Sequence, residues 1–165
     1  MTLYTAVVGI ITNIEYINHN GQTGGCTILY TLEGENPAGP FQVQLPANAF
    51  VLNLHPFQIG DRATFFYDTN APMVLIYPPR YTAIAAAYTP HGTSAVLDIF
   101  QNGLTNSDNT LKLNLAWNTP VTLLNGQPFS GDLNGYLLLV LYSMTTRSIP
   151  AQTTPEQVVV FCPNA

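Results

Sequence analysis

Charged side chains are scarce in this chain. Its 165 residues include only four Lys or Arg and nine Asp or Glu, so charged residues make up 8%, against about 25% in an average soluble domain. The four cations, Arg62, Arg80, Lys112 and Arg147, are scattered, and the net charge is -5. Nucleic-acid binding depends on clustered Lys and Arg that neutralise phosphates. We therefore expect no nucleic-acid partner.

Long hydrophobic runs are also missing. The apolar run at residues 136–142 has the length of a strand, whereas a membrane-spanning helix needs about 18 apolar residues. Residues 1–9 carry no basic segment of the kind that opens a secretory signal peptide. We expect no membrane span and no classical signal peptide.

Motifs that carry catalysis are absent. The sequence has no Gly-x-Ser-x-Gly, no His-Glu-x-x-His and no glycine-rich phosphate loop. His19, His55 and His91 each stand in a turn without a local carboxylate and nucleophile to work with. Asp61 and Asp132 each follow a glycine; they are candidate calcium ligands, but turn capping explains them better. We expect no enzyme, no cofactor and no metal site.

Cysteine is limited to Cys26 and Cys162, near opposite ends of the chain. Without a Cys-x-x-Cys pair there is no redox or zinc motif. Two buried thiols are the leading expectation, because free cysteine is among the most buried residue types. A bridge within the chain and a bridge between subunits are the alternatives.

An internal repeat is the strongest positive feature. Phe41 and Leu111 begin similar segments 70 residues apart, and Tyr67 and Tyr142 end similar apolar runs 75 residues apart. The elements shared by both copies are an alternating segment, an Asn, a Val, a Gly-Asp pair, an apolar run, a turn and a Pro before a final strand: 41–45, Asn48, Val51, Gly60-Asp61, Tyr67, Pro79 and 82–85 against 111–115, Asn118, Val121, Gly131-Asp132, Tyr142, Pro155 and 158–160. Such a repeat predicts two related modules.

Short strands separated by Gly, Asn, Asp and Pro turns predict an all-β protein. We expect two tandem antiparallel β-barrels of OB-like or Greek-key type packed together, residues 1–80 and 81–165, with a single jelly-roll-like sandwich as the alternative. No segment predicts a helix. The strands expected near the joint are residues 73–77 and 81–88, linked by the prolines at 78 and 79.

Interface residues are expected at this joint and in the loop around Arg147. Tyr77 and Tyr81, with Tyr88 and Trp117, are candidates for stacking on sugar rings, but packing in a core or interface explains them without a ligand and is preferred. Arg147 is either a pin between subunits or a cap on carbonyls of its own loop. The candidate assembly residues are Tyr77, Tyr81, Arg147, Cys26 and Cys162.

The runs Phe66-Tyr67-Asp68, Leu75-Ile76-Tyr77-Pro78-Pro79 and Thr145 to Pro155 resemble a family of uncharacterised β-proteins from anaerobic spore-forming Gram-positive bacteria. In size and uncharged polar surface the chain is also similar in type to subunits of spore appendages and extracellular fibres. That second likeness implies a polymer located outside the cell or on the spore, although such subunits characteristically carry several cysteines and an N-terminal connector.

These observations predict a non-enzymatic structural protein that binds copies of itself and forms a filament or layer. Sparse charge lowers repulsion between copies, and a head-to-tail contact between related modules propagates unless rotation closes it. The alternative is a monomeric β-module that binds a carbohydrate or another surface ligand through its loops.

Overall fold

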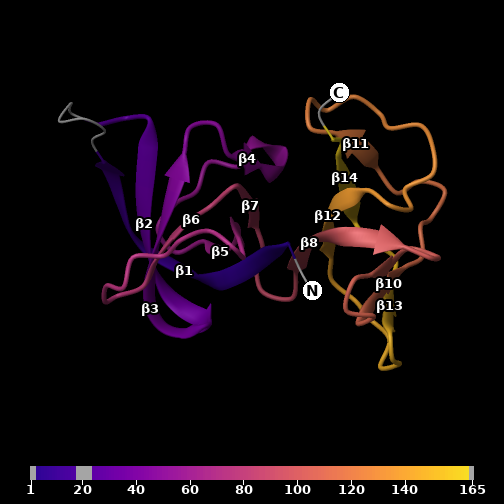
Figure 1. Cartoon of the computed structure of the whole chain (residues 1–165), viewed down its shortest axis with the longest axis horizontal. Coiled ribbons are helices and arrows are strands. Elements are labelled where there is room, and N and C mark those ends of the chain that lie inside the picture. The colour runs from indigo at the N-terminus through magenta and orange to yellow at the C-terminus, as the bar shows by residue number, and fades with distance from the viewer. Residues whose placement is uncertain (1–2, 18–23, 164–165) are drawn as a thin grey trace. The chain divides into compact units, whose positions relative to one another are not determined.

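The computed structural model describes residues 3–17 and 24–163, and it is all-β (Figure 1). Two compact modules divide the chain: module 1 is Tyr4–His91, and module 2 begins at Gly92. Each module contains one seven-stranded sheet. The only helix among the described residues is a 3-10 turn, Leu52–Leu54.

The strands of module 1 are β1 (Tyr4–Ile17), β2 (Thr27–Asn36), β3 (Ala38–Pro46), β4 (Phe50–Val51), β5 (Arg62–Asp68), β6 (Arg80–Thr82) and β7 (Ala85–Tyr88). Those of module 2 are β8 (Ser94–Gln101), β9 (Thr105–Asn106), β10 (Leu111–Leu113), β11 (Val121–Leu123), β12 (Leu137–Tyr142), β13 (Ala151–Thr153) and β14 (Gln157–Phe161).

Both modules have the same strand order. The first sheet runs β4-β7-β5-β1-β2-β3-β6, and the second runs β11-β14-β12-β8-β9-β10-β13, so each strand of module 1 has a counterpart in module 2. The pairings also agree in direction, with β3 parallel to β6 as β10 is to β13, and β4 parallel to β7 as β11 is to β14. The predicted repeat is therefore confirmed as a repeat of topology.

The final segment of each module is divided into two short strands that pair with different strands of the sheet. They are β6 and β7 in module 1 and β13 and β14 in module 2. In module 1 the peptide N–H of Ala83 donates to Gln44 O of β3 at 2.9 Å, and the next N–H, of Ile84, donates to Phe66 O of β5 at 2.8 Å. One chain segment thus bonds first to β3 and then to β5. Antiparallel neighbours together with a parallel final strand agree with the OB-like type of module that the sequence predicts, and the structure supplies the strand order.

The same division of the final segment between two strands occurs in module 2. Thr153 O, at the end of β13, accepts the N–H of Asn114 at 2.8 Å, and the N–H of Glu156 donates to Leu141 O of β12 at 2.7 Å. Pairing with two strands that are not neighbours in the sheet, within a few residues, is therefore a property of the repeat.

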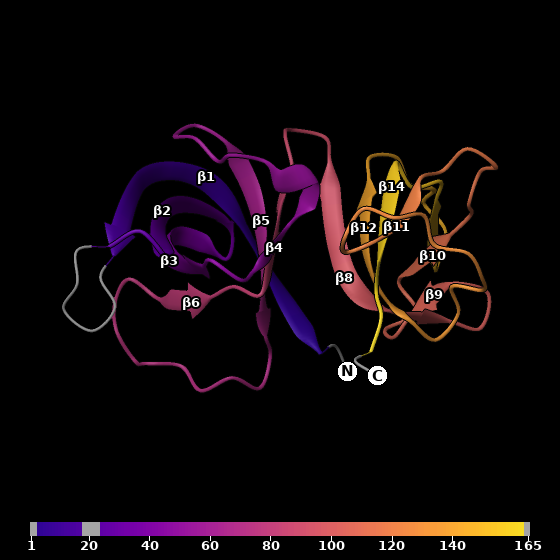
Figure 2. The same ribbon diagram turned by 90° about the horizontal axis from the view of Figure 1, so that it is seen from above.

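Strand β1 bends to follow this curvature, as the view in Figure 2 shows. Its register with β2 shifts between Val8 and Gly9 and again between Ile11 and Asn13. A Cβ at Gly9 would lie 2.6 Å from Glu33 O, closer than real Cβ atoms approach. Glycine is therefore required where the bent strand crosses its neighbour.

The core of module 1 forms because alternate residues of each strand point inward. In β3, Phe41, Val43 and Leu45 are buried. The rings of Tyr30 and Phe65 lie 5.6 Å apart and form the aromatic centre of this core. Module 2 is filled instead by aliphatic residues and one phenylalanine: Phe100, Leu111, Leu113, Leu133, Leu138, Val140, Val158 and Val160.

Two local predictions differ from the structure. Residues 73–77 form a loop, because Pro72, Pro78 and Pro79 lack N–H donors and no strand lies beside the segment to pair with it. The single strand expected at residues 81–88 is divided into β6 and β7.

The position of the joint between the modules also differs. Because β6 pairs with β3 and β7 pairs with β5, residues 81–91 belong to module 1. The expected boundary between residues 80 and 81 corresponds to the start of the last strand of module 1, and the observed division lies between His91 and Gly92.

Candidate functional site

The most exposed apolar segment of module 1 is the loop between β5 and β6, residues 69–79, here called the proline loop. Val74, Leu75 and Tyr77 are 70%, 99% and 83% exposed. Met73 and Ile76 are also exposed. Five consecutive apolar side chains in contact with water are unusual on a monomer and indicate an interaction surface.

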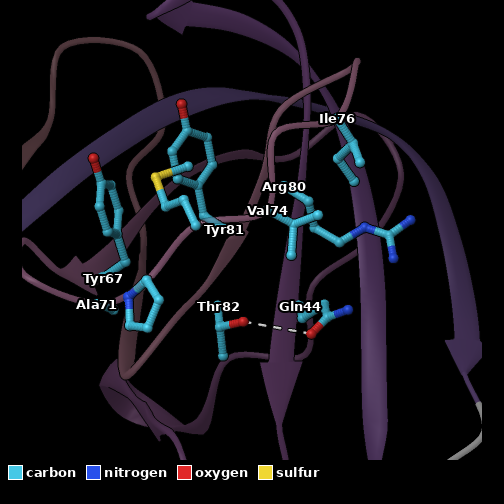
Figure 3. A pocket seen from close by; sticks show the side chains of 10 residues that line it. Gln44, Tyr67, Ala71, Val74, Ile76, Arg80, Tyr81 and Thr82 are labelled. Atoms are coloured by element: carbon cyan, nitrogen blue, oxygen red, sulfur yellow. Dashed lines mark hydrogen bonds between the residues drawn. The ribbon is translucent and has the colours of Figure 1, made fainter.

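A pocket of about 240 Å³ lies beneath the proline loop (Figure 3). Its outer wall is formed by loop residues Ala71, Pro72, Met73, Val74 and Ile76. Its inner wall is formed by strand residues Gln44, Tyr67, Arg80, Tyr81 and Thr82. The pocket is thus assembled from β3, β5, β6 and the loop, and most of its lining is apolar.

Two tyrosines form one side of the pocket. The rings of Tyr67 and Tyr81 are stacked with centroids 4.8 Å apart and an interplanar angle of 30°. The edge of Tyr81 also meets Phe41 of the core, with centroids 5.8 Å apart. Burial, together with the nearby Tyr67, raises the pKa of Tyr81 above the ordinary tyrosine value. The Tyr81 hydroxyl is therefore neutral at physiological pH.

The opposite side carries the polar groups. In Figure 3, the stem of Arg80 runs beside Val74, and its guanidinium points away from the tyrosines. Arg80 Nε and Nη2 donate to Gln42 Oε1 at 3.2 and 2.9 Å, and within the described part of the chain no carboxylate forms an ion pair with it. Gln44 Oε1 accepts the Thr82 hydroxyl at 3.4 Å, a long hydrogen bond. The rim is therefore cationic, with an amide oxygen inside.

The topological counterpart of the proline loop is residues 143–150 of module 2, which contain Arg147. This loop is held by its own bonds: the Thr146 and Ser148 hydroxyls lie 2.6 Å apart, and Ser148 Oγ donates to Pro150 O at 2.8 Å. Met144 and Ile149 are 82% and 93% exposed. Arg147 is exposed, and no hydrogen bond to its own loop is found among the described residues, in contrast to the capping alternative.

The predicted assembly residues thus lie in several places. Tyr81 forms part of the pocket wall, and Tyr77 projects from the loop above it. Arg147 lies in the equivalent loop of the other module. The structure therefore brings Tyr77 and Tyr81 to one site and leaves Arg147 at a second, related one.

Both cysteines are free and exposed, so the expectation of buried thiols is wrong. Cys26 directly precedes β2, and its carbonyl accepts the N–H of Ala47 at 2.8 Å. Cys162 directly follows β14. Each cysteine lies directly beside the end of a strand, and each belongs to a different module.

His55, Asp61 and Asp132 serve local structure. His55 Nε2 lies 2.9 Å from Asp61 Oδ2, and Asp132 accepts two hydrogen bonds from Asn134 in its own turn. His19 lies outside the described residues. In the part of the chain that the structure describes, no three His, Cys, Asp or Glu side chains gather as metal ligands, and no helix is long and apolar enough to cross a membrane.

The sequence did not reveal Gln44, Tyr67, Arg80 and Thr82 as pocket residues. They come from three strands, β3, β5 and β6. Gln44, Tyr67 and Thr82 fall within the internal repeat, but the repeat did not indicate that these strands meet. Trp117 was assigned to packing, yet it is 97% exposed at a turn. Its position directly before two turn-forming residues, Asn118 and Pro120, was the available signal.

Comparison of the chain with protein-family models, curated proteins and solved structures gave no match. The resemblance to a family of spore-forming bacteria therefore stays a hypothesis.

Proposed function

We propose that this chain is a non-catalytic structural subunit that binds copies of itself and forms a filament or layer outside the cell or on the spore surface. The observation that carries the proposal is the proline loop, whose apolar residues 73–77 are all exposed. Covering such a segment with another subunit removes apolar area from water, which stabilises the contact by about 25 cal/mol per Å².

The charge distribution supports the same function. Only 8% of residues are charged, and no charged residue occurs in the proline loop. Copies that approach through this surface meet no like-charge repulsion there. Ordinary monomers use charge to prevent such contacts.

The two exposed thiols support covalent reinforcement. One lies on module 1 and the other on module 2, so a bridge from Cys26 of one copy to Cys162 of the next would be head-to-tail. Formation of this disulfide removes two protons and two electrons from the thiols, which molecular oxygen accepts as it is reduced to hydrogen peroxide. A head-to-tail bond leaves a free thiol at each end for further growth.

Negative-stain electron microscopy and sedimentation of the purified protein test the proposal, each with and without reducing agent. We expect regular fibres or sheets, with shorter assemblies after reduction. The triple variant Val74→Ser, Leu75→Ser, Tyr77→Ser should abolish them, because it removes the exposed apolar surface while leaving the core intact. Leu54→Ser, at a position 86% exposed outside the loop, is the control. Dispersed 18.0 kDa monomers at all concentrations would refute the proposal.

A second candidate function is carbohydrate binding by a monomer. The pocket favours it through the Tyr67 and Tyr81 rings and the hydrogen-bonding groups of Gln44 and Thr82. A glycan array tests this function. Glycan binding by the wild-type protein that is lost in Tyr81→Ala would establish it, provided that the control Tyr16→Ala, at a tyrosine 65% exposed outside the pocket, still binds. If the protein binds no glycan on the array, carbohydrate binding is refuted.

A further inference from the structure

Trp117, the only tryptophan in the chain, is presented to solvent by a fixed turn. Its side chain is 97% exposed. The turn is closed on both sides, because the N–H of Thr119 donates to Ala116 O at 3.1 Å and the N–H of Ala116 donates to Thr119 Oγ1 at 2.9 Å. A rigid, exposed tryptophan loses little entropy on binding, and tryptophan is enriched at the energetic centres of interfaces.

The pocket of module 1 offers the groups that an indole ring needs. Tyr81 and Met73 supply aromatic and sulfur contacts. The indole N–H is a donor only, and Gln44 Oε1 keeps an acceptor site because it accepts one long bond from Thr82. The Arg80 guanidinium at the rim favours an electron-rich ring.

The surroundings of Trp117 suit the same contact. Residues 113–131 contain no charged side chain, so the turn brings no cation towards Arg80. Leu115 and Leu124, in the same uncharged segment, are 39% and 48% exposed. The pocket lies on module 1 and the projecting ring on module 2, so the two surfaces are different parts of one chain. Such a pair forms a head-to-tail contact, which grows when rotation does not close it.

We infer that the pocket beneath the proline loop binds the indole ring of Trp117 from a second copy of the chain. The inference rests on the proposed self-assembly and names its central contact. Alternative side chains are less suited: Ile149 and Met144 lack an N–H for Gln44, and Leu75 and Tyr77 belong to the loop that covers the pocket itself.

Because Trp117 is the only tryptophan, its fluorescence reports on this residue directly. In monomers we expect emission at long wavelength and free quenching by iodide. In the assembled protein we expect emission at shorter wavelength and loss of most of the iodide quenching, because a central interface residue is shielded from water. Assemblies in which Trp117 remains fully quenchable would overturn the inference and leave the proposed function standing.

Two variants give a complementary test. Trp117→Ala removes the ring and keeps the pocket, whereas Ala71→Phe fills the pocket from the exposed loop and keeps the ring. Each alone should fail to polymerise, and Leu54→Ala should polymerise normally. Mixed in equal amounts, the two variants should form pairs of twice 18.0 kDa, because one intact contact remains and neither end can grow.

The outcomes separate the two proposals. Wild-type polymers together with normal polymers of Trp117→Ala or Ala71→Phe would refute the indole contact only, and they would assign the pocket to another ligand such as a glycan. A wild-type protein that stays monomeric at high concentration, with Trp117 open to iodide, would refute both. Circular dichroism of each variant establishes that it is folded.

Discussion

The imidazole of His55 lies flat against the phenol ring of Tyr88, with centroids 4.2 Å apart and an interplanar angle of 4°. The same imidazole is hydrogen bonded through Nε2 to Asp61 Oδ2 at 2.9 Å. Asp61 Oδ2 also accepts the N–H of Gln58 at 3.0 Å. The end of β7 and the segment leading into β5 are thereby joined through one ring and one carboxylate.

Replacing Asp61 should therefore destabilise module 1. Asp61→Ala removes both hydrogen bonds, and we expect a loss of about 1–2 kcal/mol in the free energy of unfolding, measured by urea denaturation. Asp132→Ala is the matched control, because Asp132 follows the corresponding Gly of module 2 but, among the residues that the structure describes, hydrogen bonds only to Asn134 in its exposed turn. An equal or larger effect at Asp132 would contradict this assignment.

A buried pair of hydroxyls gives a second prediction. Thr64 and Thr89 are 2% and 0% exposed, and their Oγ1 atoms lie 2.8 Å apart. Thr89→Val leaves the Thr64 hydroxyl without this partner, which should cost about 1–3 kcal/mol. The double variant Thr64→Val, Thr89→Val should recover most of that loss, because no polar group is then stranded. Additive losses in the double-mutant cycle would show that the pair is uncoupled.

Tyr30 makes module 1 sensitive to alkali. Burial, with a smaller contribution from Tyr16, raises its pKa to about 12, from 10.0. Between these values the unfolded chain loses the phenol proton and the folded chain keeps it, so stability is complete below pH 10 and falls as pH rises towards 12. Tyr30→Phe keeps the ring against Phe57 and Phe65 and should reduce this decline. Urea midpoints across the pH range measure it, and parallel declines in both proteins would refute the prediction.

The Arg147 loop supplies a prediction about assembly. The guanidinium is exposed and suits a forked hydrogen bond to a neighbouring subunit. Arg147→Ala should lower the yield of sedimentable polymer, and Arg147→Lys should restore it only in part, because lysine keeps the charge without the fork. Lys112→Ala is the control at the other cation of module 2. An unchanged yield for Arg147→Ala would remove this loop from the interface.

Architecture was predictable because the repeat preserves the alternation of inward and outward residues. The alternating pattern of residues 41–45 predicted the buried face of β3, in which Phe41, Val43 and Leu45 are buried. Short strands such as β4 and β9 were missed, since two residues carry no period.

Neither the pocket nor the module boundary could be predicted in the same way. The apolar run at residues 73–77 has the composition of a buried strand, and only the lack of a pairing partner makes it a loop. Tyr67 and Tyr81 meet because β5 leads into that loop and β6 leads out of it. These relationships depend on which strands are neighbours, and no local pattern of residues encodes that.

The split final strand has a consequence for synthesis on the ribosome. Until residues 80–88 have emerged, β3 and β5 both present unpaired backbone groups, and neither can be satisfied by the other. A nascent chain that pauses near residue 80 therefore exposes two unpaired strand edges at once, and each can pair with another chain. Emergence of nine more residues pairs both edges, so the sheet of module 1 is completed, with the short strands β4 and β6 at its ends, before most of module 2 has been made.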